Sequence, residues 1–381
     1  MTSVFIPKET LPGETRVAAT PETITKMVKL GLQVFVEADA GAQSFLSDAD
    51  YQAAGAQTVA SAAEGYSQAN LVLKVAAPTL PELEVMPKGQ VVVSFLSPAR
   101  NLDLIRKLVE RGITSFAMDL VPRITKAQKM DALSSQANIA GYKAVLLGAS
   151  ALGRYFPLLM TAAGTVKPAR VVVFGAGVAG LQAIATARRL GAVVEATDIR
   201  PAVKEQVESL GAKFIDVAPD EGAEDEGGYA REASEDYKRR QAEAVAEHVS
   251  HADVVITTAQ VPGKKAPMLL PESMLKRMRP GSVIVDLAAD QGGNCAWTEA
   301  GKTVQKEGLI LVGETNLPAT VPSHASQLYA RNVLQVVQHL VVEGDLKLDF
   351  EEEITTGSIA VHQGEIRHAP TAEALQAGAL S

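Results

Sequence analysis

A short stretch of the chain, residues 123–142 (RITKAQKMDALSSQANIAGY), concentrates polar side chains of several kinds. Arg123, Gln128, Asp131 and Ser134 provide a guanidinium fork, an amide, a carboxylate and a hydroxyl, so that donors and acceptors occur together. An amide-bearing ring attached to a ribose presents complementary groups, and a guanidinium can hold an acceptor through two parallel hydrogen bonds. The stretch is therefore predicted to bind and orient the nicotinamide end of a dinucleotide.

The sequence GAGVAG at residues 175–180 follows a β-prone apolar run, VVVF, and opens a predicted helix. A strand that leads through a glycine turn into a helix is the context that a dinucleotide-binding fingerprint requires. Gly175 permits the tight turn, Gly177 lets the backbone approach a pyrophosphate, and Gly180 lets the helix pack on the strand. Because a helix N-terminus offers N–H donors to phosphates, Ala176 and Val178 are assigned to the cofactor site together with the glycines.

Asp198 ends the next predicted strand, where a carboxylate accepts hydrogen bonds from the ribose hydroxyls and repels the extra phosphate of NADP. The predicted cofactor is therefore NAD(H), and the alternative is a glycine-rich turn beside an unrelated surface aspartate. Ile199 and Arg200 follow and are included in the site; Arg200 is a candidate for holding a 2′-phosphate, but a proline follows it and we expect it to face solvent. Thr258 and Ala259, at the carboxyl end of a later strand, complete the predicted site.

The composition is that of a soluble globular protein with room for two hydrophobic cores, since 47% of its 381 residues are hydrophobic and 21% are charged. A net charge of −8 argues against nucleic acid or an anionic membrane as a partner. The one cysteine, Cys295, excludes an intrachain disulfide and fits a reducing compartment. No signal peptide or membrane-spanning segment is visible in the sequence.

Short apolar runs alternate with amphipathic segments along the chain, which indicates βαβ units and parallel sheets. A first series of predicted strands covers residues 4–7, 33–37, 71–75, 91–96 and 114–118, and a second series covers residues 170–177, 193–198, 212–217, 253–259, 282–288 and 309–314. Residues 134–165 are expected to form a long connecting helix broken near Pro157, and residues 323–344 another apolar helix.

These two series predict an α/β fold of two Rossmann-like domains with parallel sheets. The second is a typical dinucleotide-binding domain, residues 134–319, inserted in the first. The first domain is discontinuous, residues 1–133 plus 320–381, and we expect ITTGSIAVHQGEI at 354–366 to finish it.

Side chains suited to acid–base, nucleophilic or metal chemistry are scattered. His248 and His251 have no carboxylate or cysteine companion arranged like a metal site, so we interpret them as exposed helix residues and predict no metal. Cys295 lacks a local activating motif and is expected to be a buried structural thiol. Asp286 and Asp290 follow a predicted strand, and two roles stay open for them, in the nucleotide site or as capping groups.

Four stretches together resemble the NAD(H)-binding component of proton-translocating nicotinamide nucleotide transhydrogenase: PGETRVAATP near the start, the loop from Arg123 to Ser134, the GAGVAG turn, and GETNLPAT near residue 315. The resemblance extends over nearly the whole chain. It implies that the loop with Arg123, Gln128, Asp131 and Ser134 closes over the nicotinamide and that Tyr142 supports this loop. It also implies a Re/Si-specific transfer of hydride directly from NADH to NADP⁺, with the rings held face to face at roughly 3–3.5 Å and no acid or base.

The resemblance implies partners as well, because the chain has one dinucleotide fingerprint and no second. An NADP(H)-binding subunit would supply the other nucleotide site, and membrane-spanning subunits would supply the proton path. This chain would be a cytoplasmic homodimer, peripheral on the inner membrane through its partner subunits, with no direct membrane insertion and no nucleic acid.

Residues 219–241 (PDEGAEDEGGYAREASEDYKRRQ) are rich in acidic side chains, and a solvated loop that leads into a helix is the usual explanation for such a run. Because GGYA matches the mobile loop of the family that the chain resembles, we favour a lid instead. Gly227 and Gly228 would form its hinge, and Tyr229 would close on the nucleotide, so that Gly228 and Tyr229 are predicted to contact the cofactor.

Alanine dehydrogenases, relatives of the transhydrogenase fold, are the competing interpretation. They need an Arg and a Lys for the substrate carboxylate and a His for proton transfer. Arg16 and Lys74 match the first two and Asp290 in DQGG also fits, but the position for the His holds Ser97, which cannot transfer a proton near neutral pH. The missing His and the Arg123–Ser134 loop favour the transhydrogenase; a non-catalytic NAD-sensing module is a third alternative.

Overall fold

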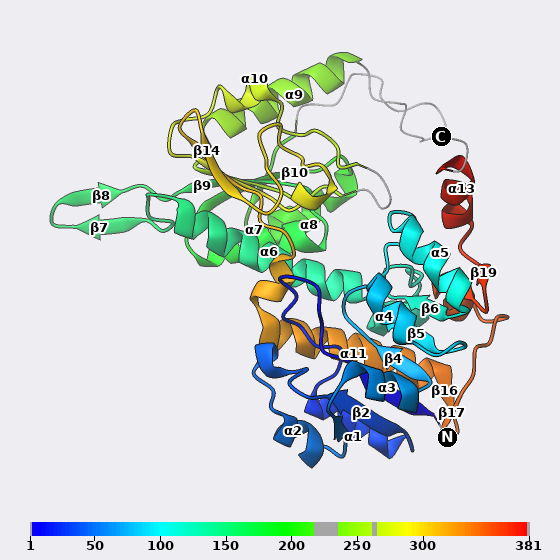
Figure 1. Ribbon diagram of the computed structural model, residues 1–381. Helices are drawn as coiled ribbons and strands as arrows, with labels where there is room; N and C mark the ends of the chain where they lie inside the picture. Colours follow the sequence, from blue (N-terminus) through cyan, green and yellow to red (C-terminus); the bar gives the residue numbers. More distant parts are fainter. Residues whose placement is uncertain (1, 217–234, 261–264, 379–381) are drawn as a thin grey trace. The chain divides into compact units, whose positions relative to one another are not determined.

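The structure, a computed structural model, describes residues 2–216, 235–260 and 265–378. The chain divides into two compact units, residues 1–136 with 318–381 and residues 137–317. Each unit contains its own mainly parallel sheet with helices packed on it (Figure 1). The predicted fold class, α/β with two Rossmann-like parallel sheets, is confirmed. Within the described ranges, no helix is both long enough and apolar enough to cross a membrane.

The sheet of the first unit has the strand order β19-β18-β6-β5-β4-β1-β2-β3. Strands β1 to β6 pair in parallel, whereas β18 and β19 add to the β6 edge in antiparallel fashion. The five strands predicted for this domain and the return of residues 354–366 are thus confirmed, and β3 is an additional strand. The bounds are β1 Ser3–Ile6, β2 Gln33–Glu37, β3 Gln57–Val59, β4 Leu71–Leu73, β5 Val91–Ser94, β6 Thr114–Ala117, β18 Ile359–His362 and β19 Glu365–Ile366.

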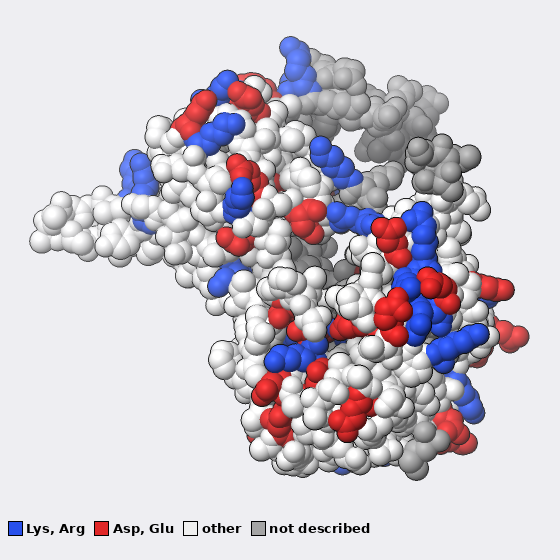
Figure 2. All heavy atoms as spheres, in the orientation of Figure 1, with Lys and Arg blue, Asp and Glu red and all other residues white. Residues whose placement is uncertain are grey.

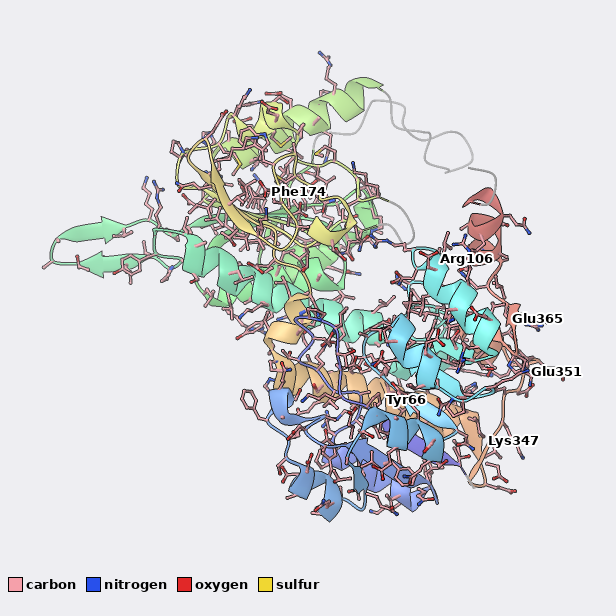
Figure 3. All side chains as sticks on the ribbon, in the orientation of Figure 1. Tyr66, Arg106, Phe174, Lys347, Glu351 and Glu365 are labelled. Carbon is pink, nitrogen blue, oxygen red and sulfur yellow. The ribbon has the colours of Figure 1, made fainter. Side chains whose placement is uncertain are left out.

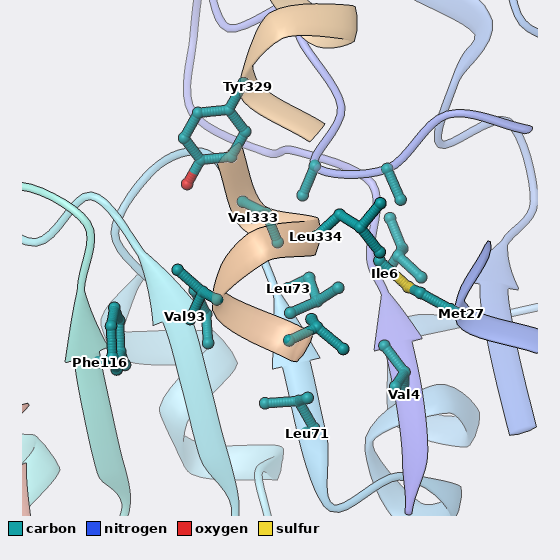
Figure 4. Close-up of a cluster of buried hydrophobic side chains, with 14 of the residues drawn as sticks. Val4, Ile6, Met27, Leu71, Leu73, Val93, Phe116, Tyr329, Val333 and Leu334 are labelled. Carbon is teal, nitrogen blue, oxygen red and sulfur yellow. The ribbon is translucent and has the colours of Figure 1, made fainter. Parts of the chain in front are cut away.

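Apolar side chains lie on both faces of this sheet, as expected for a parallel sheet covered on both sides. Val4 and Ile6 of β1 belong to one buried cluster, and Phe5, which points the other way, belongs to a second. Figure 4 shows the first cluster, in which Tyr329 and Val333 of α11 lie over the strands. The helices of this unit are α1 Pro21–Lys29, η1 Ala42–Ser44, α2 Asp48–Ala53, α3 Ala62–Gln68, α4 Leu80–Val85, α5 Leu102–Arg111, η2 Thr125–Met130, α11 Pro322–Leu340, α12 Glu353–Ser358 and α13 Ala369–Gly378.

The sheet of the second unit has the order β11-β10-β9-β12-β13-β15-β14, and only the β14–β15 pairing is antiparallel. All six strands predicted for this domain are present, and β14 is additional. The strands are β9 Arg170–Phe174, β10 Val193–Thr197, β11 Lys213–Phe214, β12 Val254–Thr257, β13 Val283–Asp286, β14 Thr303–Lys306 and β15 Leu309–Val312. The helices are α7 Val178–Arg189, η3 Pro201–Val203, α8 Lys204–Ser209, α9 Glu235–Ser250, α10 Glu272–Leu275 and η4 Ala289–Gln291.

The long helix expected over residues 134–165 is wrong in its second half. Helix α6 covers Ala132–Ala151, and an antiparallel hairpin follows, β7 Leu159–Thr161 and β8 Gly164–Val166. Each strand of this hairpin has three residues, which is too short for an alternating pattern to be recognised.

The helix expected over residues 323–344 is also too long, because α11 ends at Leu340. A second small hairpin follows, β16 Val341–Val342 and β17 Asp345–Leu346. Glu343 and Gly344 form its turn with φ of 54° and 82°. Positive φ at both central residues is the requirement of a tight hairpin turn, and it is incompatible with a continuing helix.

Helix α6 packs against the first turn of α7 with no room for a side chain at Gly141. A Cβ atom built there would lie 2.0 Å from the carbonyl oxygen of Ala179. Near the same crossing, Asn138 Nδ2 donates a hydrogen bond of 3.1 Å to Gln182 Oε1. The two helices therefore touch through their backbones where α7 begins.

We expect Gly141→Ala to lower the free energy of unfolding by about 1–3 kcal/mol, the usual effect of overpacking. In a helix without this contact, the same change would stabilise by about 1 kcal/mol, but a backbone carbonyl cannot move aside as a flexible side chain can. Urea denaturation followed by circular dichroism measures the difference. Gly153→Ala is the control, because a Cβ atom there meets nothing within 4 Å; equal losses in both variants would contradict the packing argument.

Candidate functional site

The glycine turn lies where the strand order of the second sheet reverses. From β9 the chain proceeds outward through β10 and β11, and it then returns to β12 on the other side of β9. In open α/β sheets, ligands bind at such a switch point, outside the carboxyl ends of the strands. Phe174, labelled in Figure 3, is the last residue of β9 and leads directly into the turn.

The three glycines of the turn meet three different requirements. Gly175 has φ of 93°, a conformation that other residues rarely adopt. A Cβ atom at Gly180 would lie 1.8 Å from the carbonyl oxygen of Gly175, so only glycine lets α7 begin so close to β9. A Cβ atom at Gly177 would meet no protein atom within 4 Å, so the space beside the start of α7 is open. An open helix N-terminus with N–H donors is suited to a phosphate.

Asp198, the first residue after β10, accepts hydrogen bonds from two directions. Its Oδ2 atom accepts 2.7 Å from the backbone N–H of Ala176 in the glycine turn. Arg200 donates from its backbone N–H and from Nε to Oδ1, at 2.8 and 3.0 Å, and from Nη2 to Oδ2, at 2.9 Å. Burial works to raise the pKa of Asp198, but the bonds from Arg200 and Ala176 outweigh it and lower the pKa. The expectation that Arg200 only faces solvent is therefore wrong, because its guanidinium is paired with Asp198.

Thr258 links the end of β12 to the glycine turn. Its Oγ1 atom donates to the carbonyl oxygens of Phe174 and Gly175, at 2.9 and 3.3 Å. Ala259 follows, and its carbonyl oxygen accepts 2.9 Å from Asn294 Nδ2. The structure thus brings together the glycine turn, Asp198 and Thr258 at the carboxyl edge of β9, β10 and β12, while Ile199 is almost fully exposed beside them.

Asp286 and Asn294 form a buried network under this edge. Asp286 accepts bonds from the backbone N–H groups of Ala288, Asn294 and Cys295 and from the hydroxyl of Thr257. Of the two roles left open for it, capping is therefore correct. Asn294 donates from Nδ2 to the carbonyl oxygens of Ala259 and Pro267, at 2.9 and 2.8 Å.

Asn294 is thus a residue that the sequence analysis missed. It fixes the chain on both sides of the loop that follows β12. Its only signal in the sequence is its place after two glycines, Gly292 and Gly293, which both have positive φ. Such a pair marks a sharp turn, and a buried polar residue after a sharp turn needs partners from other loops.

The loop predicted to hold the nicotinamide lies in the first unit and contains the short helix η2. Ala127 and Met130 are buried and anchor it, whereas the side chains of Arg123 and Gln128 are exposed. Asp131 follows η2 and accepts from the backbone N–H of Ser134 at 2.8 Å and from its hydroxyl at 2.6 Å. The structure therefore pairs Asp131 with Ser134 at the start of α6 and leaves Arg123 and Gln128 directed to solvent.

Arg16 and Lys74, the residues that would bind a substrate carboxylate in a dehydrogenase, are buried in ion pairs. Arg16 donates from Nε and Nη2 to the two carboxylate oxygens of Glu14, at 2.7 and 2.6 Å. Lys74 Nζ lies 3.1 Å from Glu9 Oε2 and 2.9 Å from Glu82 Oε1, and the lysine side chain is 1% exposed. Burial alone would lower the pKa of Lys74, but the two glutamates raise it above its ordinary value.

Ser97, at the position for a proton-transferring His, has a left-handed conformation with φ of 46°. Its backbone N–H and that of Leu96 donate to Asp119, at 2.8 and 2.7 Å. Burial raises the pKa of Asp119, although these backbone bonds act against the rise. Asp290, the other residue of this pattern, is exposed in η4.

The remaining candidates have structural environments or lie outside the described residues. His248 Nδ1 lies 2.9 Å from Glu195 Oε2, so its interpretation as a merely exposed residue is wrong. Cys295 is buried, and burial raises the pKa of its thiol. Across residues 2–216, 235–260 and 265–378, no cluster of His, Cys, Asp and Glu has the makings of a metal site. Gly228 and Tyr229 fall outside these ranges.

Comparison with known proteins follows the same division into two units. Residues 5–140 match the family model "Alanine dehydrogenase/PNT, N-terminal domain", and residues 144–369 match the corresponding C-terminal domain. The chain is 49% identical over 376 residues to an NAD(P) transhydrogenase subunit alpha protein of Rhodospirillum rubrum, with 96% of this chain and 97% of that protein covered. It is 32% identical over 372 residues to alanine dehydrogenase of Mycobacterium tuberculosis, with 95% and 94% covered.

Among solved structures, the crystal structure of transhydrogenase from Sinorhizobium meliloti resembles this one with a TM-score of 0.88 and 46% sequence identity. The match covers 96% of this chain and 99% of that one.

We expect Lys74→Met to lower the free energy of unfolding by about 3–5 kcal/mol near neutral pH, because two glutamates stay buried without their cation. Burial already raises the pKa of Glu9, although Lys74 acts to lower it. A carboxyl group whose pKa is higher in the folded chain binds more protons when folded, so the stability of the variant falls as pH rises from the ordinary glutamate pKa.

Denaturant unfolding of wild type and variant at about pH 5 and about pH 8 tests this pH dependence. Lys26→Met is the control, because Lys26 forms an exposed pair with Glu22 at 2.7 Å, and such pairs contribute only a few tenths of a kcal/mol. A loss for Lys74→Met that is as small as the control, or that is greater at the lower pH, would contradict the buried-pair account.

Proposed function

The chain belongs to the alanine dehydrogenase/PNT family, and from that premise we propose that it is the NAD(H)-binding component of a Re/Si-specific, proton-translocating transhydrogenase. It binds NAD(H), and it passes hydride between NADH and the NADP⁺ held by a partner subunit. The observation that carries the proposal is the complete dinucleotide turn at the switch point of the second sheet, in a chain 49% identical to a transhydrogenase subunit over 376 residues.

In the proposed site, the residues of the turn bind and orient the nucleotide. The open start of α7, from Gly175 through Ala176, Gly177 and Val178 to Gly180, offers N–H groups to the pyrophosphate. Asp198 accepts the ribose hydroxyls. The bound nicotinamide supplies or accepts the hydride. The fit is good in physical terms, because a Cβ atom at Gly177 would meet no protein atom within 4 Å.

We assign the nicotinamide end to the loop of the first unit. Asp131 and Ser134 hold each other and form a fixed polar pair at the start of α6. Arg123 and Gln128 are exposed, and no side-chain hydrogen bond joins either of them to another of the described residues, so their donors are available to a ligand. A direct hydride transfer needs positioned groups of this kind rather than an acid or a base.

Alanine dehydrogenase is the second candidate, since its Mycobacterium tuberculosis form is 32% identical over 372 residues. Two observations favour the transhydrogenase. Ser97 has no side chain that can transfer a proton near neutral pH. Arg16 and Lys74 already have buried carboxylate partners, so a substrate carboxylate would have to displace these.

We further propose a homodimer that joins an NADP(H)-binding subunit and membrane-spanning subunits, as a peripheral cytoplasmic component of their complex. The hairpin β7–β8 supports the homodimer, because it carries no charged side chain and shows neither blue nor red in Figure 2. Leu158, Met160 and Val166 are exposed on or beside it. Exposed apolar residues gathered on one element mark an interaction surface, and a second copy of the chain is the partner we assign to it.

The decisive experiment mixes the chain with an NADP(H)-binding subunit and follows reduction of thio-NADP⁺ by NADH. We expect transfer only in the mixture, and no NADH from L-alanine and NAD⁺. Gln128→Ala should leave NADH affinity near normal, because one neutral hydrogen bond contributes about 1 kcal/mol. The transfer rate should fall by around a hundredfold, because a misplacement of about 1 Å has that effect.

Lys126→Ala is the matched control for Gln128→Ala, since Lys126 is an exposed residue of the same short helix. Transfer at the wild-type rate in Gln128→Ala, or an equal loss in both variants, would remove Gln128 from the site. Robust NADH formation from L-alanine would make the dehydrogenase interpretation correct.

The homodimer is tested by replacing Leu158, Met160 and Val166 together with Ser. We expect the mass measured by light scattering to fall from that of two chains to that of one at micromolar concentration, with the circular dichroism spectrum unchanged. Leu80→Ser with Val85→Ser is the control, because these residues are similarly exposed on α4. A variant hairpin that stays dimeric would exclude this surface.

A further inference from the structure

The carboxylate of Asp198 is fully engaged before any nucleotide binds. Oδ1 accepts from the backbone N–H and from Nε of Arg200, and Oδ2 accepts from the backbone N–H of Ala176 and from Nη2 of Arg200. A carboxylate has about four acceptor positions. All four are in use, at donor–acceptor distances between 2.7 and 3.0 Å.

A ribose diol brings two hydroxyl donors to this carboxylate, so two of the present donors have to leave. The two backbone N–H groups belong to the glycine turn and to the chain just after β10, and they cannot leave without distortion of the backbone. The two guanidinium donors can leave by a change of side-chain rotamer. The Arg200 side chain is 57% exposed, so water can solvate it after release.

We propose that Arg200 is a specificity-determining residue that competes with the ribose for Asp198 and yields to it when NAD(H) binds. This inference rests on the proposed NAD(H) site. It makes the Asp198–Arg200 ion pair an internal occupant of the ribose position, held there at 2.9 Å. The affinity for NADH is then set by the difference between two sets of bonds to the same carboxylate.

The same geometry weakens the discrimination against NADP(H). When Arg200 leaves Asp198, its guanidinium remains within side-chain reach of the group that Asp198 binds, which is the ribose 2′-hydroxyl. A 2′-phosphate at that place is an anion that a guanidinium binds through two parallel bonds. Arg200 therefore opposes NADH and favours NADPH, and Asp198 does the reverse.

The test measures Kd for NADH and for NADPH by fluorescence titration, with wild-type chain and with Arg200→Ala. We expect NADH to bind two- to fivefold more tightly to the variant, the range for releasing an exposed ion pair worth about 0.4–1 kcal/mol. NADPH should bind equally well or more weakly. The sign is diagnostic, because removing a positive charge near an anionic ligand ordinarily weakens binding.

Two controls separate this competition from other effects. Lys204→Ala removes a positive charge from the next helix, where Lys204 pairs with Asp216 at 2.5 Å, and leaves Asp198 untouched; it should not tighten NADH binding. In an Asp198→Asn background, Arg200→Ala should have no tightening effect, because the competition no longer exists. The gain from Arg200→Ala should also shrink as salt screens the exposed pair in the wild type.

Unchanged or weaker NADH binding by Arg200→Ala would overturn the inference, as would the same gain from Lys204→Ala. These outcomes leave the NAD(H) site itself intact as long as the wild-type chain binds NADH. Failure of the wild-type chain to bind NADH would instead overturn the proposed function.

Discussion

The second unit depends on backbone contact around the first turn of α7. On one side, the carbonyl oxygen of Gly175 lies where a side chain of residue 180 would begin, 1.8 Å from an ideal Cβ. On the other side, Gly141 of α6 lets the carbonyl of Ala179 approach equally closely. Held between β9 and α6, this turn cannot reorient, so its N–H groups are fixed in direction before a ligand arrives. Fixed donors lose little entropy on binding, and Thr258 strengthens the arrangement by bonding to the strand end.

The first unit has a similar parallel sheet but uses its carboxyl edge differently. There Lys74, Glu9 and Glu82 satisfy one another, and Tyr66 adds a bond of 3.4 Å to Glu82. The backbone of Lys74 is fixed as well, because Tyr329 of α11 donates 2.7 Å to its carbonyl oxygen. The same architecture thus supports an internally paired edge in one unit and an open helix N-terminus in the other. Architecture alone does not decide function; the residues after the strands do.

The elements of the fold that the sequence predicts well are those with local signals. Apolar runs located all the predicted strands, and the glycine spacing located the turn, because each signal depends on near neighbours. The hairpin β7–β8 has three-residue strands with no alternation and was missed. Pairings were also beyond the sequence: Lys74 and Glu9 are 65 residues apart, and their contact depends on the order of β4 and β1 in the sheet. The direction of the Arg200 side chain, two residues from Asp198, depends on a rotamer that no pattern encodes.

A hydride transfer that crosses from one chain to another places opposite demands on the residues around the nicotinamide. They have to be positioned within a fraction of an ångström, yet they have to be accessible to the partner's nucleotide. The loop of the first unit meets both demands through its alternating character. Ala127 and Met130 are buried and fix the backbone of η2, whereas Gln128, between them, is exposed. Asp131 and Ser134 then fix the junction with α6 through bonds of 2.6 and 2.8 Å. The precision of the exposed groups therefore comes from the buried ones, which is why a short, tightly wound segment is better suited to this task than a longer flexible loop.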